Sequence, residues 1–233
     1  MKKQFLLVGI FALITTLSVA TQAQPNKLSE RIQATLTEKT TQATHFMQPD
    51  AYGTPLVIKL ARQGDTKTLH QIAHSSNAAT ILGAQDSYGN NLFHVAKNAD
   101  TVQVIAALIR QAYGTKAPTQ ITAMVDQKNK LGETPLHAQL NAGHADTFRP
   151  LYRHSTLKKK NDAANRQLMR LEGVSEDISN SNRRIYCQEI RQLGSANGRT
   201  LLQAAQGQIP YNPQMSALAQ NIGRVIPCLA NGH

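Results

Sequence analysis

Apolar residues in the central part of the chain recur three or four positions apart, in short runs separated by polar turns. A period of about 3.6 residues places such positions on one face of an α-helix. The pattern is clearest in five residues of one run: Val102, Val104, Ile105, Leu108 and Ile109. Aromatic residues make up 5% of the chain and Trp is absent, and a core of aliphatic residues suits closely packed helices better than packed sheets. The pattern therefore predicts an all-α fold.

Four stretches share one order of residues: a turn, a small polar or proline pair, a Leu or Phe, and then a helical run. In the clearest stretch, residues 132–146, GETPLH is followed three residues later by NAGHAD. Thr134 can cap a helix with its hydroxyl, and Pro135 at the first helical position loses no needed hydrogen bond. Gly143 permits the left-handed backbone that ends the helix. The unit is thus marked by six residues: Gly132, Thr134, Pro135, Leu136, His137 and Gly143.

The other three copies are more divergent. The first contains four of the same residue types: Thr54, Pro55, Leu56 and Gly64. Its glycine turn comes one residue late relative to the third copy. In the second copy, which keeps Gly89 and His94, Asn91 replaces the Thr cap and Leu92 replaces Pro; the fourth copy spans residues 197–205. Four residues are taken as equivalent, spaced 37, 43 and 66 residues apart: Leu56, Phe93, Leu136 and Leu202.

This order of residues closely resembles the ankyrin repeat, whose signature includes Thr-Pro-Leu-His and a Gly-His turn between two antiparallel helices. The resemblance implies an α-solenoid in which neighbouring helix pairs bury each other's apolar faces. It also implies that His94 and His137 form hydrogen bonds between the turns of neighbouring repeats, and that the chain lacks catalytic activity. Because ankyrin repeats are about 33 residues long, the longer spacings indicate insertions, the largest before the fourth copy.

The expected organisation has four parts: a signal peptide (1–23), an N-terminal capping helix (24–48), about three repeats (49–152), and a C-terminal part (153–233). The C-terminal part combines an inserted basic helix, the divergent fourth repeat and a cap. We expect a long helix from about Pro150 to Leu171, a loop at about 173–182, a helix holding Cys187, and a last helix from about Gln214 to Gly223.

The N-terminus has the form of a secretory signal. Lys2 and Lys3 precede an apolar stretch, and small residues provide a cleavage site near Ala23. An uncleaved signal anchor is the alternative. Export places the mature protein in the periplasm or outside the cell, where Cys187 and Cys228 are expected to form a disulfide rather than remain two free thiols.

The formal net charge is +11, and removal of Lys2 and Lys3 leaves +9 on the mature chain. Much of the positive charge falls on the expected long helix, in a basic patch of six residues: Arg153, Lys158, Lys159, Lys160, Arg166 and Arg170. A solvated helix face is one interpretation. The other is contact with an acidic protein, lipid headgroups or another acidic polymer of the cell envelope, weakened by salt. Nucleic acid is not the expected partner, because the basic run lacks interleaved aromatic residues.

No pattern in the chain indicates catalysis or a cofactor: there is no nucleophile elbow, phosphate loop or dinucleotide fingerprint. His70 and His74 could share a metal ion, which leaves a metal-dependent enzyme as a weaker alternative, but no third ligand is apparent and Gln71 excludes the metalloprotease motif. The favoured function is a monomeric binding module, an inhibitor, immunity factor or assembly aid. By the resemblance, it contacts an unidentified protein through six hairpin residues: Ser87, Tyr88, Asn90, Lys128, Lys130 and Glu133.

Overall fold

The computed structural model describes residues 44–170 and 176–230. Over this part of the chain the protein is mostly helical, which confirms the all-α prediction; β1 (Ser195–Ala196) and β2 (Arg199–Thr200) form a short antiparallel pair. The expected signal peptide and most of the expected capping helix lie outside the described residues. The N-terminal helices are α3 (Leu56–Gln63), α4 (Thr66–Leu69), η1 (His70–His74), α5 (Ala78–Leu82), α6 (Leu92–Val95), α7 (Ala99–Tyr113), η2 (Gly114–Lys116) and α8 (Ala117–Asp126). The C-terminal helices are α9 (Pro135–Asn141), η3 (Ala145–Thr147), α10 (Phe148–His154), α11 (Thr156–Arg170), α12 (Glu176–Leu193), α13 (Leu201–Gly207), α14 (Gln214–Val225) and α15 (Pro227–Ala230).

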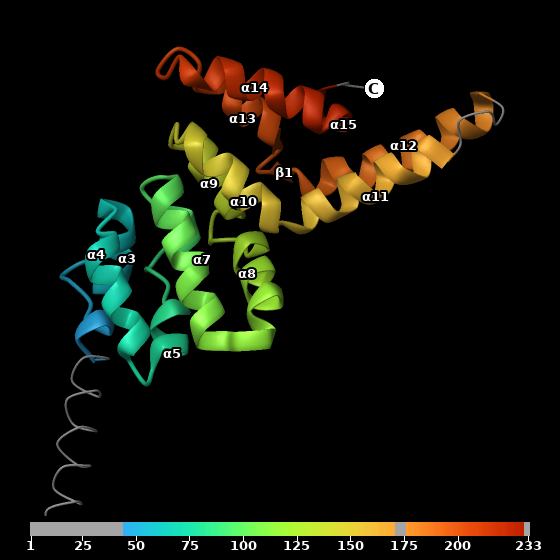
Figure 1. Cartoon of the computed structure of the whole chain (residues 1–233). Coiled ribbons are helices and arrows are strands. Elements are labelled where there is room, and N and C mark those ends of the chain that lie inside the picture. Colours follow the sequence, from blue (N-terminus) through green and yellow to red (C-terminus); the bar gives the residue numbers. More distant parts are fainter. Residues whose placement is uncertain (1–43, 171–175, 231–233) are drawn as a thin grey trace, which may run out of the picture. The chain divides into compact units, whose positions relative to one another are not determined.

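Four short helices, each preceded by a polar turn, pack on one another in chain order: α3 on α6, α6 on α9, and α9 on α13. Each is followed by a second helix, and α7 packs on α10 in the same way (Figure 1). The core runs through this stack and is mainly aliphatic; Ile58, Ile105 and Leu140 are fully buried, together with the aromatic Phe93. Because each pair covers its neighbour's apolar face, no single pair could bury its own side chains alone.

Three additional elements account for the long spacings between copies. Helix α5 follows the first pair, and α8 follows the second pair. Helices α11 and α12 form a long hairpin between the third and fourth copies (Figure 1). The largest insertion is therefore where the sequence predicted it.

The turns correct the alignment of the first copy. Gly53, Gly89 and Gly132 occupy equivalent turn positions, each with φ of 76°. Counted from the Thr-Pro pair, helix α3 begins one residue later than α9, because its N-cap is Pro55 whereas the N-cap of α9 is Thr134. The residue equivalent to Phe93, Leu136 and Leu202 is therefore the fully buried Val57, not the partly buried Leu56. With this register Gly64 and Gly143 both lie eleven residues after their turn glycines, so the Gly64 turn is not late.

The expected long helix is two helices. Helix α10 begins at Phe148, two residues before Pro150, and ends at His154; the backbone of the next residue, Ser155, is extended. The buried Ser155 hydroxyl donates to the Tyr152 carbonyl oxygen (2.8 Å) and accepts from Lys158 N (3.2 Å), so that one side chain closes α10 and caps α11. Helix α12 begins at Glu176, inside the stretch expected to be a loop, and α14 spans Gln214–Val225, close to the predicted last helix.

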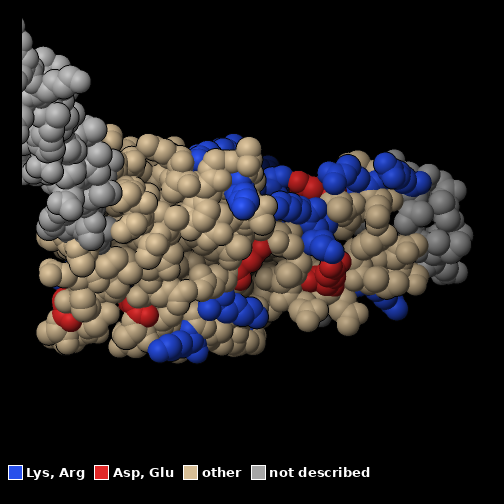
Figure 2. Space-filling model, turned by 90° about the horizontal axis from the view of Figure 1, so that it is seen from below, with Lys and Arg blue, Asp and Glu red and all other residues tan. Residues whose placement is uncertain are grey.

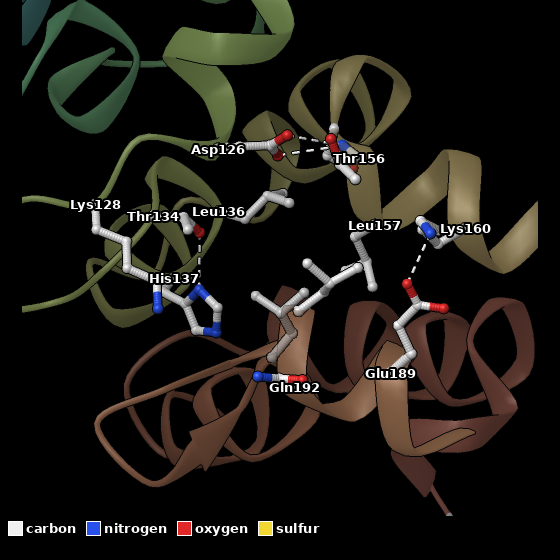
Figure 3. A pocket seen from close by; sticks show the side chains of 13 residues that line it. Asp126, Lys128, Thr134, Leu136, His137, Thr156, Leu157, Lys160, Glu189 and Gln192 are labelled. Carbon is white, nitrogen blue, oxygen red and sulfur yellow. Dashed lines mark hydrogen bonds and ion pairs between the residues drawn. The ribbon is translucent and has the colours of Figure 1, made fainter. Parts of the chain in front are cut away.

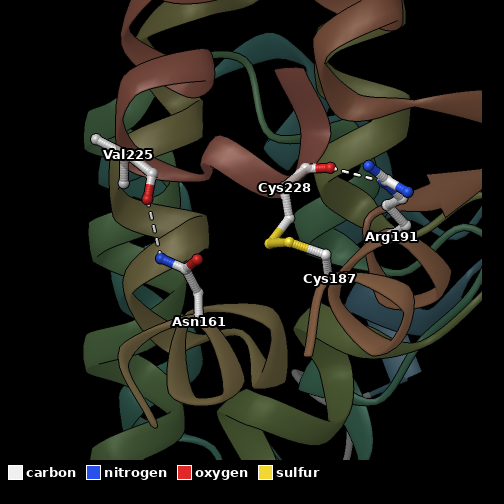
Figure 4. The surroundings of a disulfide bond; sticks show 5 residues. All are labelled: Asn161, Cys187, Arg191, Val225 and Cys228. Carbon is white, nitrogen blue, oxygen red and sulfur yellow. Dashed lines mark hydrogen bonds between the residues drawn. A yellow bond between two sulfur atoms is a disulfide. The ribbon is translucent and has the colours of Figure 1, made fainter. Parts of the chain in front are cut away.

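Cys187 of α12 and Cys228 of α15 are joined in a disulfide, as predicted (Figure 4). Two further bonds hold the same region: Arg191 Nε donates to the Cys228 carbonyl oxygen (2.8 Å), and Asn161 Nδ2 donates to the Val225 carbonyl oxygen (2.9 Å). The C-terminal segment is thereby tied to both helices of the α11–α12 hairpin. Among the described residues, no helix is both long enough and apolar enough to cross a membrane.

Candidate protein-interaction site

The first three turns are built by one side chain each. Asp86 Oδ1 accepts hydrogen bonds from Tyr88 N (2.9 Å) and Asn90 N (3.0 Å). Asp50 makes the equivalent pair of bonds in the first turn, and Asn129 makes them in the third. A short side chain that accepts from the backbone two residues ahead stabilises a tight turn. These turns hold the residues at their tips in one conformation.

Neighbouring turns are also bonded to each other. Lys130 N donates to the Tyr88 carbonyl oxygen (2.9 Å), and Lys130 Nζ donates to the Ser87 carbonyl oxygen (2.7 Å). Asn129 Nδ2 donates to Asn90 Oδ1 (2.9 Å). A Cβ at Gly89 would lie 3.3 Å from Lys130 N, so the close approach of the turns favours glycine there. Ser87, Asn90 and Lys130, expected as partner contacts, thus take part in joining the second turn to the third.

Three exposed apolar side chains occupy the same place in the three turns. Tyr52, Tyr88 and Leu131 each lie two residues after the Asp or Asn that builds the turn, and they are 84%, 65% and 60% exposed. We call these three residues the tip row. Of its members the sequence analysis selected only Tyr88. The signal for the others was present as Asp-x-Tyr-Gly twice and Asn-x-Leu-Gly once.

Glu133 and Lys128, the remaining residues expected to contact a partner, are not part of the tip row. Glu133 is half-buried and accepts from Asn141 Nδ2 (2.7 Å). Lys128 lines a cavity of about 430 Å³ between the third helix pair and the α11–α12 hairpin. In Figure 3 its side chain lies beside His137, opposite Lys160 and Glu189, whose ion pair (2.7 Å) joins α11 to α12.

The two histidines in equivalent positions have different surroundings. His94 Nδ1 accepts from Asn91 N (3.2 Å), and its Nε2 lies 3.0 Å from the Glu133 carbonyl oxygen in the next turn. His137 Nδ1 lies 2.8 Å from Thr134 Oγ1 (Figure 3), so this hydroxyl does not cap the backbone of α9 as expected. His137 Nε2 is buried and has no partner at hydrogen-bond distance.

Burial has the largest effect on the pKa of His94 and of His137. It lowers the pKa of His94, against the opposing effects of the Glu133 backbone and nearby carboxylates. It lowers the pKa of His137 to about 4, with a partial opposing effect from the backbone of Gly194. Both imidazoles are therefore mostly neutral near pH 7. Only His94 joins neighbouring turns as expected; the bond predicted for His137 is not formed, because its Nδ1 contacts Thr134 of its own turn and its Nε2 is buried without a partner.

The predicted basic patch is not one surface. Lys158 pairs with Asp162, Lys160 pairs with Glu189, and Lys159 Nζ donates to Thr122 Oγ1 of α8 (3.1 Å). Arg166 and Arg170 are exposed on α11. In the view of Figure 2, Lys and Arg side chains gather on the part of the molecule that leads to the α11–α12 hairpin. Arg153 belongs to α10 and lines a groove between α7 and α10.

His70 and His74 are both exposed, and no group of three His, Cys, Asp or Glu side chains suited to a metal ion occurs among residues 44–170 and 176–230. No model of a known protein family matches the chain, and a search of curated proteins found no relative. The candidate site therefore depends on its own geometry, of which the tip row is the most regular feature.

Proposed function

We propose that this chain is an exported protein of the ankyrin-repeat type that acts without catalysis, by binding a partner protein through its tip row. The observation that carries the proposal is the repetition of an exposed apolar side chain at one turn position, in Tyr52, Tyr88 and Leu131. Single exposed apolar residues are common on protein surfaces. Three at equivalent positions of successive turns are a regular feature of the surface, and none of the three belongs to the core.

The ankyrin assignment is supported by the stacked helix pairs, the glycine turns in register and the His94 bond to the next turn. Export is supported by the form of the N-terminal sequence and by the Cys187–Cys228 disulfide, since such bonds persist in oxidising compartments. The roles that suit such a protein are inhibitor, immunity factor or assembly aid.

Rigid aromatic side chains make effective anchors. Tyr loses little conformational entropy on binding, and it combines an apolar ring with a polar end. The Asp50 and Asp86 turns already fix the backbone beneath Tyr52 and Tyr88. A partner that buries the tip row would therefore gain apolar contact without ordering a flexible loop.

The test is a crosslinked pull-down from envelope and culture-medium fractions at low and high salt. It compares the unmodified mature protein with the variant Tyr52→Ser/Tyr88→Ser/Leu131→Ser. The matched control is Tyr211→Ser, because Tyr211 is 82% exposed but lies between α13 and α14, outside the turns.

We expect one protein to be retained at high salt by the unmodified chain and by the control, and to be lost from the triple variant by at least about tenfold, as for central anchor residues. Retention by the triple variant, combined with release by salt, would contradict the proposal. That result would instead favour binding of an acidic envelope component by the basic residues.

A further inference from the structure

A second surface lies between the second helices of two neighbouring pairs, away from the turns. A groove of about 820 Å³ runs between α7 and α10. Its accessible apolar lining includes Val104, Ala107 and Pro150, and its basic lining consists of Arg110, Arg149, Arg153, His70 and His154. We call this the arginine groove. The sequence analysis did not include Arg110, because α7 brings it to α10 only in the folded protein.

The positive charge of the arginine groove is not balanced from within. Its single carboxylate, Asp146, accepts a hydrogen bond from Ala99 N (2.8 Å) at the start of α7. Arg110, Arg149 and Arg153 are exposed, and none of them forms an ion pair with any described residue. This differs from Lys158 and Lys160 of α11, which each have a carboxylate partner.

The pKa of His154 is also affected by the excess of positive charge in the arginine groove. Burial lowers the pKa of His154, and the positive charges of Arg110, Arg153 and Lys159 lower it further. Three cations from α7, α10 and α11 therefore act on one imidazole. Like charges held close together repel each other, so an anion placed among them is attracted.

We propose that the arginine groove binds an acidic peptide segment of a partner protein, with apolar side chains on the groove floor and carboxylates paired with Arg110, Arg149 and Arg153. Guanidinium groups bind carboxylates through two parallel hydrogen bonds, which gives geometric selectivity. The apolar floor between the arginines favours an amphipathic peptide over a uniformly charged polymer. The recessed position of the floor favours a peptide over the flat surface of a membrane.

The test measures the fluorescence anisotropy of a labelled synthetic helical peptide that carries Leu along one face and Glu on the flanks. Two further peptides replace Glu by Gln or Leu by Ser. The protein variant is Arg110→Gln/Arg149→Gln/Arg153→Gln. Its control, Arg166→Gln/Arg170→Gln/Arg183→Gln, removes the same charge from exposed arginines of α11 and α12. Vesicles containing phosphatidylglycerol form a separate arm, and circular dichroism checks that each variant is folded.

We expect the groove variant to weaken binding of the Glu/Leu peptide by at least about tenfold, and the control variant by less than about threefold, because paired charges contribute far more than distant ones. Both altered peptides should also bind at least about tenfold more weakly than the parent. Equal loss in the two variants would overturn the proposal, as would equal binding of the Leu→Ser peptide. Binding to vesicles without binding to the peptide would do the same and identify a membrane-surface site.

Discussion

Asp50, Asp86 and Asn129 each organise a turn with one side-chain oxygen. The oxygen accepts hydrogen bonds from two backbone N–H groups of the turn. Asn serves as well as Asp in this role, because both carry an accepting oxygen at the same distance from the backbone. Asp86 additionally pairs with Arg62 of α3 (3.2 Å), which links the second turn to the first helix pair.

Two substitutions at Asp86 distinguish the contribution of its turn hydrogen bonds from that of its ion pair with Arg62. Asp86→Asn keeps the Oδ1 acceptor of the turn and removes the charged Oδ2, which accepts from Arg62 and Asn90. It should lower the free energy of unfolding by about 1 kcal/mol, since Asp86 is buried but Arg62 is half-exposed. Asp86→Ala removes both, and should cost about 2 to 3 kcal/mol because two backbone donors lose their acceptor. Urea unfolding, with the exposed Ser87→Ala as control, measures both. Equal costs for the two Asp86 variants would show that the ion pair dominates.

Buried His137 makes the stability depend on pH. Its pKa is about 4 in the folded protein, against about 6.5 in the unfolded chain. The unfolded state therefore binds the additional proton in this window, and the free energy of unfolding falls as the pH drops from about 6.5 towards 4. The full loss from this residue is about 3 kcal/mol.

His137→Gln should remove that share of the pH dependence, while exposed His74→Gln should leave it unchanged. The measurement is urea unfolding of the oxidised protein at several pH values between neutral and mildly acidic. His94 acts in the same direction, so the slope should decrease in His137→Gln without vanishing. Identical slopes in the two variants would mean that the pKa of His137 is the same in the folded and the unfolded protein, which would contradict the prediction.

At the scale of elements, the four first helices share a packing role but begin in two different ways. Pro55 and Thr134 precede α3 and α9 without a side-chain bond to the helix backbone. Asn91 and Thr200 form capping boxes with the third helical residue, His94 and Gln203. Packing of α3, α6, α9 and α13 on one another therefore matters more than any one cap, as expected for helices of four to eight residues.

The disulfide acts on the C-terminal elements. It closes 41 residues of chain between α12 and α15, and a loop of this length stabilises the folded state by about 4 kcal/mol in the chain-entropy model. Cys187→Ser/Cys228→Ser should lower the protection of α12, α14 and α15 against hydrogen exchange, and leave α3, α6 and α7 nearly unchanged. Uniform loss of protection along the chain would show that the stack unfolds only as a whole.

At the scale of the whole molecule, the tip row and the arginine groove are separate surfaces. One is formed by turns and the other by the second helices α7 and α10. Among the described residues, no hydrogen bond or ion pair joins the side chains of the two sets. Side chains without shared partners contribute independently to stability.

The stability changes of the tip-row and arginine-groove triple variants should therefore add, within about 0.5 kcal/mol, when the two are combined. The tip-row variant should also bind the Glu/Leu peptide as the unmodified protein does. Thermal unfolding and fluorescence anisotropy measure the two effects. A clear departure from additivity would indicate coupling through α6 or α9, which lie between neighbouring turns and second helices.

Much of the fold was predictable because its signals are local. Apolar spacing identified the helices, and turn glycines identified the copies. Their relative register was not predictable in the first copy, where Thr54-Pro55-Leu56 matches the third copy by residue type but is displaced by one position. The Asp50 turn, not the proline, sets where α3 begins. The break at Ser155 was missed because its cause is a side chain that bonds to both neighbouring helices.

The sequence by itself determined the helical class and the turns of the second and third copies, because periodicity and glycine act through short-range geometry. It left Cys187 and Cys228 as the only possible disulfide pair, because the chain has two cysteines. The tertiary structure decided which side chains share a surface. It brought Arg110 to Arg149 and Arg153, gave Lys158 and Lys160 carboxylate partners, and showed Tyr52, Tyr88 and Leu131 to be exposed at equivalent positions. These arrangements depend on how separate helices pack, and residue spacing along one helix carries no information about its neighbour.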